Sequence, residues 1–433
     1  METKKLLSEI KGFVPDISYI EEDRDDYDFS MESDKNEELI TLDEKENTIN
    51  TLKATPDTEE KFSAFIDGTY ITAKIGYLYG VPIYVSNITC ALLIRDDDNY
   101  SKNFNEFHKN LFVLMYPFDS VSLYAKEYKN DKEMADAIRE LKDRFCREYN
   151  AIMDFKVRED SLNELKKINN TNIWICSDIS YKGLQGDDES GYRGDWDIEK
   201  NEIFNMGKIS RKVRARTRVI MGILEATYLR AYREKYGNDK WVLMDGTLNY
   251  SYKYCLSEYR QGKKFNEYFD KTVGFVKTIR RKVFESEPEK LFKLFSMKEG
   301  EYIITMGIKN DTEEKVLEEL NEREIGKKKW GFVYMRFRFP PYLQNEKLSK
   351  SICTPKGIIK AQFVINETDE DYIKEYTLEK GMKIANMIAY EKFPLPSDKK
   401  RLWNETLAIE EAEKVAKSRL MSKHYLEHLG LIL

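Results

Sequence analysis

The chain from residue 61 to 94 alternates apolar and polar positions, and Gly and Pro interrupt the alternation. Segments 62–66, 70–78 and 83–94 are rich in β-branched and aromatic residues. A period of two in residues of these types is typical of strands. The pattern therefore predicts a strand meander that begins at Lys61.

Later apolar segments predict further elements. We expect strands at 173–176, 240–244, 273–277, 303–307, 330–339 and 358–365, and helices at 131–149, 209–234, 284–297, 369–390 and 403–420. Strands and helices mix without a regular βαβ repeat or an internal repeat. Such mixing favours an α/β fold with a mixed sheet and flanking helices.

The first sixty residues differ from the rest. After a short helix candidate at 1–12, residues 13–60 are rich in Asp, Glu, Asn and Thr. Such composition is typical of a solvated acidic extension that is partly flexible or binds a partner. We expect an extension at 1–60, the main domain at 61–420 and a C-terminal tail at 421–433.

Composition limits the class of protein. The 433 residues are 41% hydrophobic and 13% aromatic, which is enough for a large core. We find no apolar run of about 18 residues and no secretory h-region at the N-terminus. The expectation is a soluble, cytoplasmic protein with no membrane segment.

The chemistry available to the chain is also limited. Its five cysteines are scattered without a C-x-x-C pair, so a zinc ribbon or disulfide framework is not expected. With only three histidines, carboxylates, Lys or Tyr must carry most of any chemistry. The net charge of -6 argues against nonspecific coating of nucleic acid, but it allows an enzyme with a local basic channel.

One tripeptide, Asp-Gly-Thr, occurs twice after an apolar run. Phe-Ile-Asp-Gly-Thr occupies 65–69 and Leu-Met-Asp-Gly-Thr occupies 243–247. Each run is expected to deliver an aspartate, Asp67 or Asp245, at the exposed end of a strand. The glycine then allows a turn or a close approach to a ligand. Ordinary Asp-Gly turns are the alternative interpretation.

The predicted helix at 209–234 adds a third carboxylate. Arg214, Arg218 and Glu225 fall at helical spacing on one face. Glu225 has Met, Gly, Ile, Leu and Ala as neighbours, and a buried carboxylate needs a partner, either an arginine or a metal ion. Two Asp and one Glu suit Mg²⁺ or Mn²⁺, which can activate water and stabilise the oxygens of a phosphodiester.

Basic residues near these acids are candidate phosphate ligands. The arginines of the helix, Arg214 and Arg218, would contact phosphate beside the metal. Lys277 ends the strand Val-Gly-Phe-Val-Lys and could neutralise developing charge, or it could be a lysine that extends from a strand end to solvent. Arg336 and Arg338 alternate with aromatics and would line a strand-binding channel, or belong to the wet face of an amphipathic strand.

In this order, the motifs resemble those of the NurA nuclease family over about residues 60–415. The resemblance implies an RNase H-like central mixed sheet with additional helical and strand insertions. It implies a Mn²⁺-dependent DNA nuclease, with single-strand endonuclease and 5′ to 3′ exonuclease action, that acts as a homodimer on a hexameric HerA-type ATPase in DNA end resection. It also places Asp67, Glu225 and Asp245 at the metal-binding acids, and Lys277 at the lysine of the following strand.

The C-terminal region resembles the family with one departure. The family tends to carry Ala-His on a helix after an aromatic-Pro segment, whereas Glu413 follows Ala412 here. A carboxylate can bind metal but cannot act as a neutral imidazole base. Glu413 is therefore the candidate for the fourth catalytic position, with Glu410 and His424 as alternatives.

Two other functions compete with a nuclease. A NurA-like subunit with weakened chemistry would cap and regulate a HerA-type ATPase without cutting DNA. A carboxylate-pair hydrolase such as a glycosidase would act without added metal, but the Arg-bearing helix and Lys277 fit phosphate better than sugar.

Overall fold

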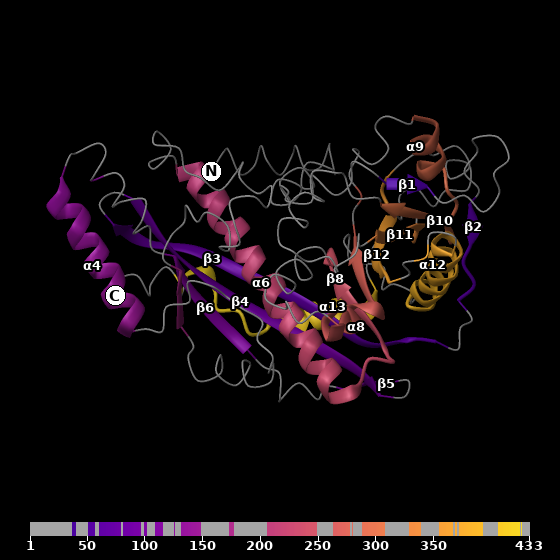
Figure 1. The fold of residues 1–433 in the computed structure, drawn as a ribbon, viewed down its shortest axis with the longest axis horizontal. Coiled ribbons are helices and arrows are strands. Elements are labelled where there is room, and N and C mark those ends of the chain that lie inside the picture. Colours follow the sequence, from indigo (N-terminus) through magenta and orange to yellow (C-terminus); the bar gives the residue numbers. More distant parts are fainter. Residues whose placement is uncertain are drawn as a thin grey trace, which may run out of the picture.

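A twelve-stranded mixed sheet organises the part of the chain that the computed structural model describes, and helices lie on both of its faces (Figure 1). The described residues are 37–39, 51–56, 60–78, 81–96, 99–101, 109–115, 131–148, 173–176, 206–248, 263–277, 288–307, 329–338, 355–366, 372–392 and 406–424, together with 125, 279, 369 and 426.

The strands are β1 (Glu37–Leu39), β2 (Leu52–Lys53), β3 (Phe62–Leu78), β4 (Val81–Asp96), β5 (Asn99–Ser101), β6 (Lys109–Met115), β7 (Ile173–Cys176), β8 (Trp241–Asp245), β9 (Thr272–Val276), β10 (Glu301–Gly307), β11 (Lys329–Arg336) and β12 (Ile358–Ile365). Their order across the sheet is β1-β10-β11-β12-β9-β8-β3-β4-β6-β7, with β2 paired to β10 and β5 to β4.

Three parallel strands occupy the middle of this order. β8 runs parallel to β3 on one side and to β9 on the other. β4 is antiparallel to β3 and β6 is antiparallel to β4, while β12 is antiparallel to β9. The mixed α/β class expected from the sequence is therefore confirmed.

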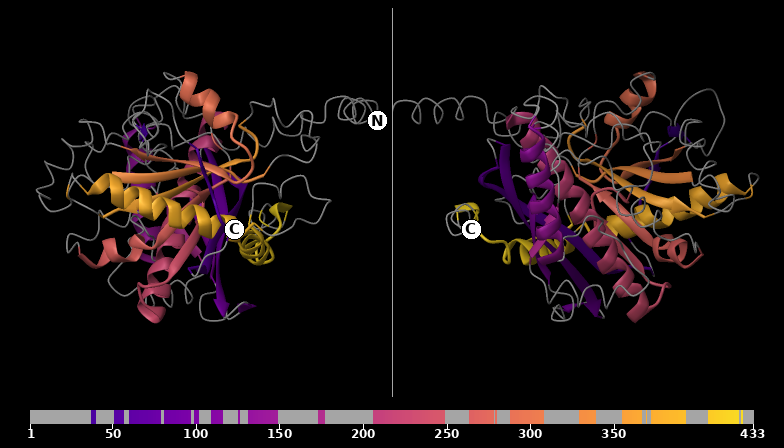
Figure 2. Two further views of the ribbon diagram at one scale, coloured as in Figure 1. Left: turned by 90° about the vertical axis from the view of Figure 1, so that its right-hand side faces the viewer. Right: turned by 60° about the vertical axis from the view of Figure 1, so that its left-hand side comes forward.

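The helices are α4 (Lys132–Glu148), α6 (Met206–Tyr236), α8 (Lys263–Asp270), α9 (Pro288–Phe295), α12 (Ile373–Tyr390) and α13 (Leu407–Lys417). The long helix α6 and the short helix α13 lie on opposite faces of β3 and β4 (Figure 2).

The alternation of side chains along β4 distinguishes these two faces. Ser86 Oγ lies 2.7 Å from Thr217 Oγ1 of α6, whereas Thr89 Oγ1 donates to the carbonyl oxygen of Ala416 in α13. Residues an odd number apart on a strand point to opposite faces. We call them the α6 face and the α13 face.

The largest part of the core lies on the α13 face. Phe65, Leu243 and Phe275 project from the three parallel strands into one buried cluster, which also contains apolar residues of β11, β12, α12 and α13. Burial of apolar area at roughly 25 cal/mol per Å² makes such a cluster the main stabilising contribution. It fixes the strands from which the site is built.

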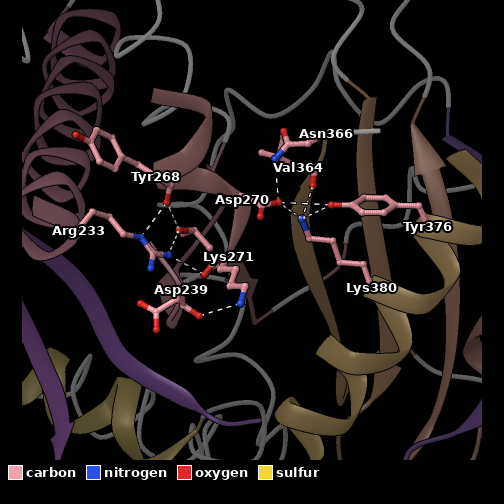
Figure 3. A network of polar contacts seen from close by, with 10 residues as sticks. Arg233, Asp239, Tyr268, Asp270, Lys271, Val364, Asn366, Tyr376 and Lys380 are labelled. Atoms are coloured by element: carbon pink, nitrogen blue, oxygen red, sulfur yellow. Dashed lines mark hydrogen bonds and ion pairs between the residues drawn. The ribbon is translucent and has the colours of Figure 1, made fainter. Parts of the chain in front are cut away.

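Buried polar contacts hold the amino ends of the parallel strands (Figure 3). Arg233, near the end of α6, donates to the carbonyl oxygens of Lys240 and Lys271, the residues just before β8 and β9. Burial lowers the pKa of Arg233 to about 10. Lys380 of α12 forms a 2.7 Å ion pair with Asp270, just before β9. Because one guanidinium joins both strand starts, β8 and β9 begin at a fixed offset.

Most elements agree with the sequence patterns. The predicted strands and helices from 131 onward appear, and α9 lies within the helix expected at 284–297. Segments 62–66 and 70–78 are one continuous strand, and the sequence patterns did not predict β1, β2, β5, β6 and α8. The helix candidate at 1–12, most of the acidic extension and the tail beyond 426 lie outside the described residues. Among the described helices, none is long and apolar enough to cross a membrane.

Candidate active site

Asp67, Asp245 and Lys277 lie on or just after the three parallel strands, at the level where β8 and β9 end. Ile66 pairs with Met244 and Asp245 pairs with Phe275, so the three polar residues lie on adjacent strands at one level. Each follows a core residue of the α13 face by two positions and therefore projects from that face. Ligands of open α/β sheets bind at such strand ends.

The first Asp-Gly-Thr does not end its strand, contrary to the expectation from sequence. β3 continues from Gly68 to Leu78, and Asp67 is almost fully buried within it. β8 stops at Asp245, so β3 extends past its neighbour. The strand continues because its other edge stays paired to β4 through this region. Asp67 thus lies at the level where β8 ends. Beyond this level, β3 is no longer paired to β8.

Gly68 allows a close approach rather than a turn. A Cβ atom built on Gly68 would lie 2.5 Å from Glu225 Oε1 and 2.7 Å from Met221 Cγ, both on α6. Carbon and oxygen atoms cannot come that close without a shift of one of them. Because Gly68 has no side chain, Glu225 can lie against the β3 backbone.

The second Asp-Gly-Thr does form a turn. Gly246 has a φ of 78°, a left-handed conformation that L side chains rarely adopt. Its N–H donates to the carbonyl oxygen of Phe275 at 2.9 Å, and the Leu248 N–H donates to Gln362 Oε1 at 3.0 Å. A Cβ on Gly274 would lie 2.8 Å from the Gly246 oxygen, so the returning chain packs closely on β9. The turn fixes the backbone that follows Asp245.

Glu225 reaches the site from the α6 face. It is buried and accepts a hydrogen bond from the Gly68 backbone N–H. On α6, Glu225 faces the sheet, while Arg214, about three turns earlier, is exposed. The single Arg-and-Glu face expected from sequence agrees with these contacts, because Arg218 and Glu225 both contact β3, through Tyr70 and Gly68.

Burial and mutual repulsion shape the electrostatics of the acids. Burial, and then the Asp245 charge, raise the pKa of Glu225 to about 8. Burial first, and the Asp245 charge second, raise the pKa of Asp67 well above its usual range. The pKa of Asp245 is raised by burial, although Lys277 lowers it. Like charges gathered in a dry site disfavour ionisation, so a cation there would be strongly favoured.

One ammonium group partly offsets this charge. Lys277 Nζ lies 3.2 Å from Asp245 Oδ1, and both side chains are about one quarter exposed. The site is therefore closed around Asp67 and open to solvent at Asp245 and Lys277. A substrate would enter on this open side.

Glu413 joins the site from α13. Its charge raises the pKa values of both Asp67 and Asp245, so it lies near both acids. It also forms an ion pair with Lys417 and is one quarter exposed. Of the two alternatives from sequence, Glu410 pairs with Lys414 at 3.0 Å and His424 is exposed on the surface.

The acids fit an ion that is completed by water and substrate. Among the described residues, no three His, Cys, Asp or Glu side chains already lie close enough to enclose a metal. Yet Asp67 Oδ2 is buried without a hydrogen-bond partner in the described part of the chain. Mg²⁺ uses one or two carboxylates and keeps several waters. An open carboxylate site with one uncompensated oxygen matches that preference.

The four candidate arginines separate into two pairs. Arg218 donates from Nε to Tyr70 Oη at 3.0 Å, and the exposed Arg214 lies one turn further from Glu225 along α6. Both lie on the α6 face beside the far half of β3. They remain candidates for phosphate contacts along β3 beyond the acids.

Arg336 and Arg338 do not reach the site, so their assignment to substrate binding is corrected. Arg336 is fully buried and donates to the carbonyl oxygens of Met297 and Phe295. Its neighbours on β11, Phe332 and Tyr334, belong to a buried cluster distinct from that of the parallel strands. Arg338 is also buried, and burial lowers its pKa. The alternation placed these arginines on the face away from Asp67.

Comparison with known proteins adds little to this geometry. No family model matches the chain, and no curated protein matches it. A solved structure with some likeness is the crystal structure of the NurA nuclease from Sulfolobus solfataricus. The identity is 12%, the match covers 99% of this chain and 95% of that chain, and the TM-score is 0.36. At that TM-score the likeness carries no weight for function, which rests on the site itself.

Proposed function

We propose that this protein is a divalent-metal-dependent DNA nuclease, a phosphodiester hydrolase that uses Mn²⁺ or Mg²⁺. The observation that carries the proposal is the meeting of Asp67, Asp245 and Glu225 where β8 ends. Three elements from different parts of the chain bring together acids whose pKa values are raised. Such a cluster is costly unless a cation neutralises it.

Each side chain has a role in this proposal. Asp67, Glu225 and Asp245 would hold the ion, which when bound activates water and stabilises the oxygens of the phosphodiester. Lys277, at the open side, would stabilise charge on the phosphate. Glu413, from α13, would accept a proton or orient water. Arg214 and Arg218 would position the DNA backbone by contacts to phosphate.

The strand arrangement supports an RNase H-like core. The five strands β6-β4-β3-β8-β9 are neighbours in that order, an antiparallel meander that continues into two parallel strands. The acids lie on β3 and at the end of β8, in the middle of this group. The remaining strands, with α9 and α12, would be the expected insertions.

A cleavage assay tests the nuclease. Wild-type protein with Mn²⁺ should cut end-labelled single-stranded DNA, and EDTA should stop the cutting. The Asp67→Asn and Asp245→Asn variants should not cut. The matched control is Asp136→Asn, because Asp136 is an exposed aspartate on α4 in a surface ion pair. Full activity in the first two variants would refute the proposal.

A second candidate function rests on Glu413. Since Glu413 pairs with Lys417 and replaces the expected histidine, the protein would be a NurA-like subunit with weakened chemistry that caps and regulates a HerA-type ATPase. DNA binding without cutting in Mn²⁺ or Mg²⁺ would favour it.

Five further properties stay predictions from the resemblance and the composition. They are the HerA-type partner, the homodimer, the 5′ to 3′ polarity, the role in end resection and the cytoplasmic location. Co-purification with a HerA-type ATPase and light scattering of the purified chain would test the first two. Degradation of DNA labelled at either end would test the polarity.

A further inference from the structure

A cluster of basic and aromatic side chains lies on the α6 face, beyond the acids. The Lys74 ammonium donates to Tyr77 Oη and lies 4.8 Å from the centroid of the Tyr77 ring. Tyr84 is paired with Lys74 across β3 and β4. The Tyr84 hydroxyl is hydrogen-bonded to Ser210; burial raises its pKa, and the charges of Lys74 and Arg214 lower it. Two cations and two phenol rings therefore meet at one place. We call Lys74, Tyr77, Tyr84 and Arg214 the distal cluster.

A β-bulge creates the distal cluster. Lys74 pairs with Tyr84, and Gly76 pairs with Ile83, so one residue of β3 is extra between them. Without the bulge, Lys74 and Tyr77, three residues apart, would point to opposite faces. The bulge places Tyr77 on the same face as Lys74. Bulges near active sites commonly re-aim a side chain in this way.

The distal cluster lies further along β3 than the acid site and on the other face from Asp67 and Asp245, so a DNA strand that reaches both would pass the edge of β3 beyond the end of β8. From Gly68, where Glu225 contacts β3, the α6 face runs through Tyr70 with its partner Arg218 to Lys74. Six residues of strand span roughly 20 Å at about 3.3 Å per residue. A stacked DNA strand advances about 3.4 Å per nucleotide, so about six nucleotides span the same length.

We propose that the distal cluster binds single-stranded DNA about six nucleotides from the acid site. This deepens the proposed function and rests on it for the identity of the ligand. Lys74 and Arg214 contact phosphates, and the Tyr77 ring, which is 53% exposed, stacks on a base. Tyr84 is buried beside the two cations.

The composition of the cluster favours a single strand over an acidic protein. An acidic protein surface needs cations, but it gives no reason for an exposed ring beside them. In single-stranded nucleic acid, phosphates alternate with bases whose flat faces stack on aromatic rings. The raised pKa of Lys74, caused first by its hydrogen bond to Tyr77, keeps the ammonium charged at neutral pH.

The test is binding in EDTA, where no cutting can occur. Fluorescently labelled dT12 is titrated with wild-type protein, the Lys74→Gln/Arg214→Gln double variant and Tyr77→Ala over a range of salt. Matched controls are Lys383→Gln and Tyr372→Ala, since both residues are exposed and lie on or next to α12.

The double variant should make the plot of log affinity against log salt shallower by about 1.4, or about 0.7 for each phosphate lost. Tyr77→Ala should weaken dT12 binding by about five-fold or more. Both controls should match the wild type. Thermal melting of each variant shows whether it is folded. Folded variants that bind dT12 with the wild-type affinity and salt dependence would overturn the proposal.

Two further measurements separate this proposal from the nuclease itself. The wild type should prefer dT12 to dT4, and the distal-cluster variants should lose that preference. If poly-glutamate competes as well as dT12, the surface binds any polyanion and the proposal is wrong. If Mn²⁺ supports no cutting but the variants still lose dT12 binding, the nuclease fails and the distal cluster stands.

Discussion

The two Asp-Gly-Thr segments have the same three residues and different structures. At 67–69 the tripeptide lies inside β3, with its backbone paired to β4. At 245–247 it ends β8, and Gly246 takes a left-handed conformation. One glycine is required for space and the other for its dihedral angles. The same tripeptide therefore meets two different physical requirements at its two positions.

The difference explains how acids from both faces meet. Asp67 and Asp245 project from the α13 face, whereas Glu225 belongs to α6 on the other face. Because the second segment turns away and the first continues, β3 extends past the end of β8. Glu225 can then contact Gly68 at the open edge. The site therefore needs one tripeptide in an extended strand and the other in a turn.

The largest expected effect removes the carboxylates themselves. Asp67→Asn or Asp245→Asn should lower the Mn²⁺-dependent cleavage rate by at least about 100-fold, since a catalytic ion contributes several kcal/mol to the transition state. Rates on labelled single-stranded DNA measure it. Because both aspartates would bind the same ion, both substitutions should abolish cleavage. A loss of cleavage in only one variant would contradict a shared role for the two segments.

The next effect concerns the space at Gly68. Gly68→Ala should displace Glu225 and weaken Mn²⁺ affinity by about 10- to 100-fold, as for other changes in the surroundings of metal ligands. Calorimetric titration measures the affinity. The matched control is Gly76→Ala in the same strand, where a Cβ would meet nothing within 4 Å. Equal Mn²⁺ affinities in the two variants would contradict the role assigned to Gly68.

The pH dependence of stability tests the burial of Glu225. Its pKa is raised in the folded state to about 8 from an ordinary 4.5, so the folded protein holds the proton more tightly. The stabilisation is full below about pH 4.5 and is lost as pH rises toward 8, by up to about 1.4 kcal/mol per pH unit. Urea unfolding in EDTA between pH 5 and 8 measures it.

The comparison protein for that measurement is Glu225→Gln, which cannot ionise at this position. Its free energy of unfolding should fall less steeply over the same pH range. Identical slopes for the two proteins would show that Glu225 is not the group responsible.

The smallest effect concerns the turn at Gly246. Gly246→Ala should lower the free energy of unfolding by about 1 to 2 kcal/mol, the cost of a left-handed conformation for an L side chain. Because no atom lies within 4 Å of the added Cβ, the Mn²⁺ affinity should change less than in Gly68→Ala. A larger loss of affinity than in Gly68→Ala would reverse the assignment of the two glycines.

Periodicity predicted the strands and helices well because most of them have one buried face. It also identified Asp67, Glu225, Asp245 and Lys277 as candidates, and the structure brings these four together. The sequence did not show that β3 continues past Asp67, because that depends on pairing with β4 and on the distant α6. Nor did it separate the faces of β11, so Arg336 was misplaced. Lys74 and Tyr77 were missed because only the bulge puts them together.

The most direct test is Mn²⁺ binding measured by calorimetry at pH 7 in two buffers of different ionisation enthalpy. The raised pKa values of Glu225 and Asp67 predict that binding displaces about one proton or more, because ligating carboxylates must be ionised. Asp67→Asn and Asp245→Asn should weaken binding, and Glu225→Gln should bind with less proton release. Wild-type protein that binds no Mn²⁺, or aspartate variants that bind it as tightly as the wild type, would contradict the account.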